Sequence, residues 1–234
     1  MINTAQQVKK ELKALGSPQK AKDSSWFFKT GPGQYGAGDI FFGNTVPEQR
    51  KISKEYQDLS SSQIQILLND PYHECRLTAL LILVLQFKRG NNEVQKKIFN
   101  FYLKNYKYIN NWDLVDTSAS HIVGGYLLNK PRSILYQMVK SDNLWKKRIA
   151  IVSTLAFIQN NEFTDTLKMA KILLNDQHDL IHKSVGWMLR EVGKRDQKIL
   201  EFFLNQHSGQ MPRTMLRYAI ERFNEKKRKF YLNK

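Results

Sequence analysis

Two residues one helical turn apart, Trp112 and Asp116, have types and a spacing that suit chemistry on a positively charged group. Helix positions i and i+4 share a face, so the indole and the carboxylate would point the same way. The same period turns a neighbouring set of apolar residues toward the core: Leu114, Val115 and Ile122. A carboxylate stabilises positive charge that develops in a reaction, and an indole face attracts a cation by about 0.5–2 kcal/mol. A structural interpretation stays open, with Trp112 in the core and Asp116 balanced by Arg148.

A second candidate face runs from residue 183 to residue 194. Helical spacing places four residues on it: Lys183, Trp187, Arg190 and Lys194. The opposite, apolar face holds Ile181, Val185, Met188 and Val192. An aromatic plate among cations is typical of a nucleic-acid contact, whereas a solvated helix face would show the same charges.

The net charge points to a polyanionic partner. The chain of 234 residues has 37 Lys and Arg against 21 Asp and Glu, which gives +16. A surface with a general basic bias is the alternative, because net charge bears on association rather than on fold.

The longest nearly apolar run, residues 77–87, is about half the roughly 20 residues of a membrane-spanning helix. The single cysteine, Cys75, suits a reducing compartment, and we expect an intracellular protein of the cytoplasm or nucleoid, or of the nucleus if the source is a eukaryote.

The pattern of the chain predicts an all-α protein. Nearly every segment has helical period, apart from an irregular stretch over residues 30–45 that ends where Val46 and Pro47 suit a helix start. Helices that begin near Pro71, Asn111, Asp142, His178 and Met211 are separated by 40, 31, 36 and 33 residues. Such steps are typical of paired helices in an α-solenoid. We therefore expect one domain over 1–234, with N-terminal helices and a glycine-rich loop in 1–45 and repeats in 46–234.

Equivalent positions of stacked repeats line one concave wall. One charged residue stands about one turn into each of these helices: Arg76, Asp116, Arg148, Lys183 and Arg217. Four of the five are cations, which predicts a concave basic groove for a phosphate backbone. Ordinary charged helix surfaces would give the same pattern.

Two other motifs in the sequence give weaker evidence of function. The string from Gly31 to Gly36 fits G-x-G-x-x-G, but no strand precedes it and no helix opens at its end, so a dinucleotide site is excluded. Tyr35 lies in this loop, where its ring could stack on a base or anchor the loop. His178 and His182 are four residues apart without a third ligand nearby, so we expect a helix cap and no metal site.

Five ordered motifs resemble the AlkD-like DNA alkylation repair glycosylases, a family built from HEAT-like helical repeats. The motifs are 30–39 with 46–50, 111–116, 145–150, 185–191 and 211–222, so the resemblance covers nearly the whole chain. It implies removal of purines alkylated at N3 or N7 from duplex DNA, with Asp116 as the catalytic carboxylate and Trp112 and Trp187 as aromatic walls. It further implies that Arg148 contacts the DNA backbone and that Tyr35 is the family's N-terminal aromatic residue.

The residue patterns and the family resemblance together predict a monofunctional DNA glycosylase that acts as a monomer without a metal or cofactor. The residues expected to contact DNA are Arg148, Tyr35, Lys183, Arg190, Lys194, Arg213 and Arg217, and the basic tail 226–229 could follow phosphates or be a solvated end. Two alternatives remain: a non-catalytic HEAT-repeat protein that recognises bent or branched DNA, and a protein-interaction solenoid.

Overall fold

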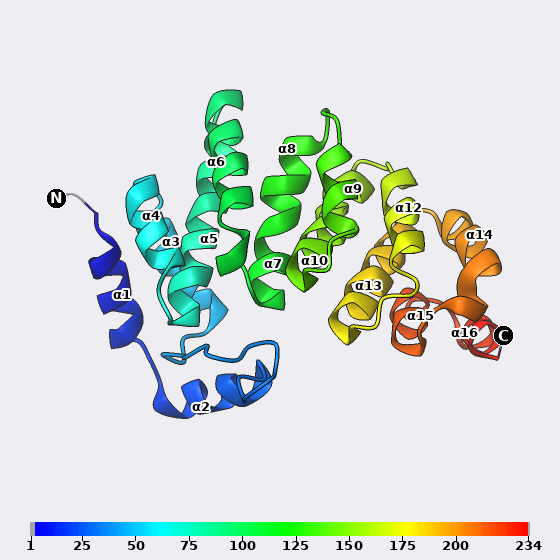
Figure 1. Ribbon diagram of the computed structural model, residues 1–234, viewed down its shortest axis with the longest axis horizontal. Coiled ribbons are helices and arrows are strands. Elements are labelled where there is room, and N and C mark those ends of the chain that lie inside the picture. The colour runs from blue at the N-terminus through cyan, green and yellow to red at the C-terminus, as the bar shows by residue number, and fades with distance from the viewer. Residues whose placement is uncertain (1–2, 234) are drawn as a thin grey trace. The chain divides into compact units, whose positions relative to one another are not determined.

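A computed structural model describes residues 3–233 and divides into two compact units, Met1–Ile122 and Val123–Lys234. Within the described residues the chain is all α, and β-type pairing is limited to one isolated parallel bridge between Ile40 and Tyr72 (Figure 1). The predicted fold class, an all-α protein of helical repeats, is confirmed. The basic groove and the division of the chain at residue 45 stay predictions.

The first unit is built around one long helix, α5 (His73–Arg89), which packs against α3, α4, α6 and α7. Its helices are α1 (Ala5–Ala14), α2 (Pro18–Phe27), α3 (Val46–Glu55), α4 (Ser61–Leu68), α5, α6 (Asn92–Lys104), the 3₁₀ turn η1 (Tyr106–Tyr108) and α7 (Trp112–Ala119). Every side chain from His73 to Val84 is buried, which explains why the apolar run there forms a core helix. The predicted restart at residue 46 is confirmed: α3 has Pro47 in its first turn and a capping box between Thr45 and Glu48.

The loop between α2 and α3 is fastened to the first turn of α5. The Glu74 carboxylate accepts hydrogen bonds from the backbone N–H groups of Phe42, Gly43 and Asn44, at 2.8–3.3 Å. Gly43 has φ +87°, and a Cβ there would lie 2.2 Å from the carbonyl oxygen of Ser17 at the start of α2. Only glycine fits this close approach, so the loop is held between two helices.

The second unit is arranged around α13 (Asp179–Arg195), which contacts α10, α11, α12, α14 and α15. Its elements are η2 (Ser120–Gly124), a π-helical turn that begins in the first unit, then α8 (Gly125–Leu127), α9 (Ser133–Val139), α10 (Leu144–Ser153), α11 (Leu155–Gln159), α12 (Thr164–Ile172), α13, α14 (Gln197–His207), η3 (Ser208–Gln210), α15 (Arg213–Ala219) and α16 (Glu225–Leu232). A Cβ on Gly186 would lie 2.5 Å from the carbonyl oxygen of Met215. Glycine thus lets α15 pack directly on the backbone of α13.

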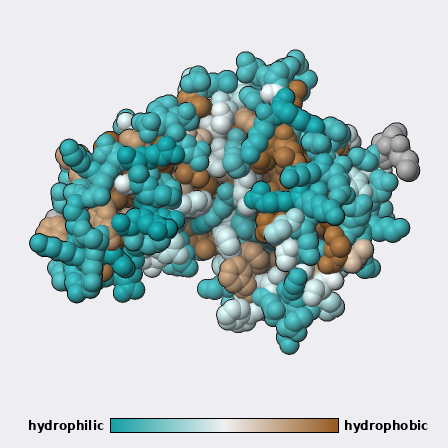
Figure 2. Space-filling view, turned by 180° about the vertical axis from the view of Figure 1, so that it is seen from behind, coloured by the Kyte–Doolittle hydropathy of each residue, from teal (hydrophilic) through white to brown (hydrophobic). Residues whose placement is uncertain are grey.

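The helix starts expected from the repeat spacing agree with the structure. Helices α5, α7, α10, α13 and α15 begin within two residues of the predicted positions. Hydrophilic residues dominate the face drawn in Figure 2, with smaller apolar areas between them. Among residues 3–233, no helix has both the length and the apolar character that crossing a bilayer requires.

Candidate active site and nucleic-acid interface

The short helix α7 presents Trp112 and Asp116 as predicted from their spacing. Asn111 caps the helix, and its side-chain oxygen accepts a hydrogen bond from the Trp112 N–H at 2.8 Å. Trp112 and Asp116 are both half-buried. The residues expected in the core, Leu114, Val115 and Ile122, are fully buried. An indole and a carboxylate therefore share the accessible face of this helix.

Trp112 belongs to an aromatic cluster that the sequence did not reveal. Phe28 stacks on it with ring centroids 5.4 Å apart, and Phe27 meets it edge-on at 5.8 Å. Phe41 in turn stacks on Phe28, with ring centroids 5.4 Å apart, and on the ring of His73 at 5.0 Å. These contacts fix the plane of the indole ring. The signal that could have found them is the aromatic run Trp26-Phe27-Phe28 at the end of α2.

Two aromatic side chains at the end of α2 are open to solvent. Trp26 is 83% exposed and Phe27 is 56% exposed. They line a hollow of about 580 Å³ together with Asp23 and Ser24. Large aromatic side chains this exposed are unusual on a protein surface and suit stacking against a ligand.

Behind Trp112 lies a cluster of buried charges that sequence reasoning also missed. The His73 ring nitrogens face Asp39 Oδ2 at 3.1 Å and Asp113 Oδ2 at 2.7 Å. Arg76 donates to Asp39 Oδ1 at 2.6 Å and to the carbonyl oxygen of Asp70 at 3.1 Å. Arg76 is buried, so the structure corrects the expectation that it is a cation of the concave wall.

Tyr35 lies in the loop between α2 and α3 and is half-buried. The two glycines at positive φ nearest to it are Gly33 at +73° and Gly38 at +88°. They let the chain turn sharply on both sides of the ring. Stacking of Tyr35 on a base stays a prediction.

The predicted face of α13 is present in the second unit. Lys183, Trp187 and Arg190 are half-buried and Lys194 is exposed. The apolar side, Ile181, Val185, Met188 and Val192, is fully buried. The helix therefore presents an indole among three cations.

Each cation of this face has a carboxylate partner. Lys183 pairs with Asp179 at 2.6 Å, and Lys194 pairs with Glu191 at 2.7 Å. Arg190 pairs with Glu221, and its Nε lies 3.6 Å from Glu191. Counting charges in the sequence therefore overstates the positive charge that this face has to offer.

The other predicted DNA-contacting arginines differ in exposure. Arg148 on α10 is 4% exposed and donates a hydrogen bond to the carbonyl oxygen of Leu180 at the start of α13. Arg213 and Arg217 on α15 are exposed, and Arg213 also donates to the carbonyl oxygen of Leu232 at 2.6 Å. Phosphate contacts by all three stay predictions, and Arg148 has the least accessible side chain.

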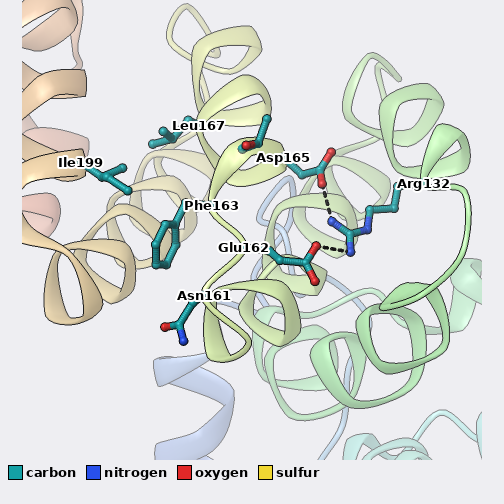
Figure 3. Close-up of a pocket in the computed structure, with 8 residues that line it drawn as sticks. Arg132, Asn161, Glu162, Phe163, Asp165, Leu167 and Ile199 are labelled. Atoms are coloured by element: carbon teal, nitrogen blue, oxygen red, sulfur yellow. Dashed lines mark hydrogen bonds and ion pairs between the residues drawn. The ribbon is translucent and has the colours of Figure 1, made fainter.

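A pocket of about 410 Å³ in the second unit lies at the start of α12. Figure 3 shows Arg132 there between Asp165 and Glu162, each at 2.6 Å. Tyr136 donates to Asp165 at 2.6 Å as well. Arg132 thus ties the start of α9 to α12 through Asp165, and the only cation that lines this pocket among the described residues is already paired.

Of the two histidines at the start of α13, His178 caps the helix. The side chain of His178 accepts a hydrogen bond from the Leu180 N–H at 3.1 Å, and His182 Nε2 contacts the carbonyl oxygen of Asp176 at 2.5 Å. Within the part of the chain that the structure describes, no three His, Cys, Asp or Glu side chains are grouped to hold a metal ion.

Comparison with known proteins identifies the family. No curated protein matches the chain significantly. A solved structure described as a predicted DNA alkylation repair enzyme from Enterococcus faecalis has a similar fold, with a TM-score of 0.72 over 90% of this chain and 97% of that one, at 17% sequence identity. The family model for DNA alkylation repair enzymes matches residues 8–223. The chain thus belongs to the DNA alkylation repair enzyme family.

Proposed function

We propose that the protein is a monofunctional DNA glycosylase that removes purines alkylated at N3 or N7 from duplex DNA. The observation that carries this proposal is that Trp112 and Asp116 lie one turn apart on the partly exposed face of α7. Membership of the alkylation repair family, from the match over residues 8–223, supports it.

The chemistry of the lesion explains why a carboxylate and an indole suffice. A purine alkylated at N3 or N7 carries a positive charge, and the electron pair of the breaking C1′–N bond neutralises it. The base leaves without being protonated, while positive charge grows on the deoxyribose. A nearby carboxylate stabilises that charge and orients the water that adds to C1′ with loss of a proton. Asp116 takes this role in the proposal.

Trp112 and Trp187 provide the aromatic contacts. An indole face attracts the cationic nucleotide by about 0.5–2 kcal/mol and excludes water, which strengthens the effect of the carboxylate. Phe28 holds the ring of Trp112 in place by stacking on it. In the proposal, Arg148, Lys183, Arg190, Lys194, Arg213, Arg217 and Tyr35 contact the DNA. Those on α13 must exchange carboxylate partners for phosphates.

Release of free base from duplex DNA containing N7-methylguanine tests the proposal. We expect base release by the wild-type protein, and a rate about 100- to 1,000-fold lower for Asp116→Asn under single-turnover conditions. Asp142→Asn removes an exposed carboxylate from a loop and is the matched control, with an unchanged rate. No base release by the wild type, or equal release by Asp116→Asn, would contradict a catalytic role for Asp116.

The same samples separate the alternatives. A non-catalytic DNA-binding protein would bind DNA without releasing base, and Asp116→Ala would raise its affinity by removing a negative charge. A protein-interaction solenoid would bind DNA with little dependence on salt. The proposed enzyme requires log K to fall with log salt by about 0.9 for each phosphate contacted.

A further inference from the structure

Four ionisable side chains are buried together in the first unit and take no part in the proposed chemistry. Asp39, His73, Arg76 and Asp113 are 7%, 2%, 5% and 8% exposed. Buried charges are costly unless they are paired and hydrogen-bonded. The four side chains therefore need partners, and they find most of them in one another; Arg76 Nε is a buried atom of the cluster without a hydrogen-bond partner.

His73 is the centre of this network, and its contacts favour the doubly protonated ring. Both ring nitrogens lie within hydrogen-bond distance of a carboxylate oxygen, at 3.1 Å to Asp39 and 2.7 Å to Asp113. A neutral imidazole donates from only one nitrogen, whereas the imidazolium donates from both. Burial lowers the pKa of His73, but the charge of Asp113 and the hydrogen bonds to both carboxylates outweigh it and raise the pKa to about 9. Arg76 pairs with Asp39. The cations His73 and Arg76 therefore balance the carboxylates Asp39 and Asp113.

The network joins three segments that are distant in sequence. Asp39 belongs to the glycine-rich loop, His73 and Arg76 to the first turn of α5, and Asp113 to the first turn of α7. Asp39 Oδ2 also lies 3.4 Å from the Nδ2 of Asn111, the residue that caps α7. The loop and α5 are thereby fastened to the N-terminal end of α7 by charged and polar side chains.

This end of α7 is the one that carries the candidate site. Asp113 directly follows Trp112 and precedes Asp116 by three residues. The face of the His73 ring stacks on Phe28 at 4.9 Å, and Phe28 in turn stacks on Trp112. His73 thus contacts α7 in two ways: through Asp113 at the edge of its ring, and through Phe28 and Trp112 at its face.

We propose that His73 is a positioning residue: held between Asp39 and Asp113, its ring fixes the start of α7 and so the orientation of Trp112 and Asp116. The part of this inference that concerns catalysis rests on the proposed glycosylase function. The part that concerns Trp112 does not, because it is a statement about geometry alone.

The indole N–H signals in a proton–nitrogen NMR spectrum test the geometric part. The chain has four tryptophans, and Trp112→Phe assigns the signal of Trp112. We expect His73→Gln to shift or broaden that signal and to leave those of Trp145 and Trp187, in the second unit, unchanged. An unchanged Trp112 signal in a folded His73→Gln protein overturns the proposal, whatever the enzymatic activity.

A double-mutant cycle tests the catalytic part. Displacement of a catalytic group by about 1 Å can cost up to about 100-fold in rate, so His73→Gln should slow single-turnover release of N7-methylguanine by about 10- to 100-fold. Because Trp112 would still be displaced, the same substitution should also slow the residual reaction of Asp116→Asn, but by a clearly smaller factor than it slows the wild type. An equal fold-change in both backgrounds overturns the positioning role, because a general structural defect would act on both alike.

Two further variants complete the experiment, one as a control and one as a substitute for His73→Gln. His207→Gln replaces a half-buried histidine of α14 and is the matched control, with an unchanged Trp112 signal and rate. Should His73→Gln fail to fold, Asp39→Asn keeps the bond between His73 and Asp113 and weakens the contacts of Asp39 with His73, Arg76 and Asn111. Asp39→Asn should then shift the Trp112 signal, and a folded Asp39→Asn protein with wild-type signal and rate overturns the proposal. A wild-type protein that releases no base, with a Trp112 signal that moves in His73→Gln, refutes the glycosylase function and leaves the geometric inference standing.

Discussion

The two compact units hold their candidate tryptophans in different ways. Trp112 stands at the first position of the short helix α7 and is held by side chains from distant segments, namely the Phe28 ring and, through Asp113, the buried His73. Trp187 lies in the middle of the 17-residue helix α13, next to Gly186, where the backbone of α15 packs closely. Stacking contacts hold the first tryptophan, whereas the second lies beside a helix contact that leaves no room for a side chain at Gly186.

The charged side chains of the two regions also differ, in how deeply they are buried. The ions around α7 are buried, and breaking one buried pair costs several kcal/mol. The ion pairs on α13 are partly exposed, and an exposed pair contributes about 0–1 kcal/mol and is readily exchanged for another partner. The first region is suited to holding one geometry for chemistry, and the second to giving up carboxylates for phosphates.

The largest expected effect is a pH dependence confined to the first region. The pKa of His73 is about 9 in the folded protein against an ordinary value of 6.5, so the network stabilises the fold fully below about pH 6.5. That stabilisation, about 3 kcal/mol by linkage, disappears as the pH rises through 9. Urea unfolding at pH 6 and pH 10 should show the loss in the wild type and in His207→Gln.

The variant His73→Gln isolates this contribution. It lacks the titrating group, so its difference from the wild type in unfolding free energy should shrink between pH 6 and pH 10. Groups that titrate in both proteins cancel in this difference. A constant difference would mean that His73 is neutral in the folded state and that charge does not hold α7.

A backbone substitution gives the corresponding test of the second region. The Cβ of Gly186→Ala would lie 2.5 Å from both the Met215 carbonyl oxygen and the Tyr218 Cβ, so α15 must move. We expect a loss of about 1–2 kcal/mol in unfolding free energy, after the gain in helix propensity from alanine. Gly209→Ala is the control, because a Cβ at Gly209 meets nothing within 4 Å. Equal stability of the two variants would show that close packing does not hold α13.

The contrast between the regions also explains how much could be predicted from the sequence. The faces of α7 and α13 follow from helical period, which is a local property, and the apolar residues placed on their buried sides are buried. The helix starts follow from local caps and breaks, as with Thr45 and Pro47 at α3.

The network around His73 could not be predicted in this way. Its hydrogen bonds join residues 34 and 40 positions apart, and no periodicity links a loop aspartate to two helix starts. A weak signal was present: His73, Glu74 and Arg76 are polar residues at the head of a strongly apolar run, and all three are buried. Polar residues in such a place need partners, but the sequence does not say which. The ion pair between Arg190 and Glu221, 31 positions apart, was hidden for the same reason, whereas the pairs of Lys183 and Lys194 join residues one turn apart on α13.

Truncation of each tryptophan compares the regions directly. Trp112→Leu and Trp187→Leu should each slow release of N7-methylguanine by about 2- to 30-fold, the range given by loss of one cation–π contact. Trp145→Leu, a half-buried tryptophan of α10, serves as the control with an unchanged rate. A loss in Trp112→Leu alone would confine the chemistry to the first region, and a loss in neither would remove the aromatic contacts from the mechanism.

The smallest expected effect concerns the surface charges of α13. Glu191 lies 2.7 Å from Lys194 Nζ and 3.6 Å from Arg190 Nε, so it competes with phosphates for both cations. Glu191→Gln should tighten binding to undamaged duplex DNA by about two- to fivefold, in line with the roughly 0.2–1 kcal/mol of a surface pair, and steepen the salt dependence. Glu93→Gln, which removes the 2.8 Å partner of Lys97 on α6, is the matched control and should leave affinity unchanged. Equal affinities for the two variants would place the phosphate contacts away from α13, because freeing a cation strengthens binding only where a phosphate can take the place of the lost carboxylate.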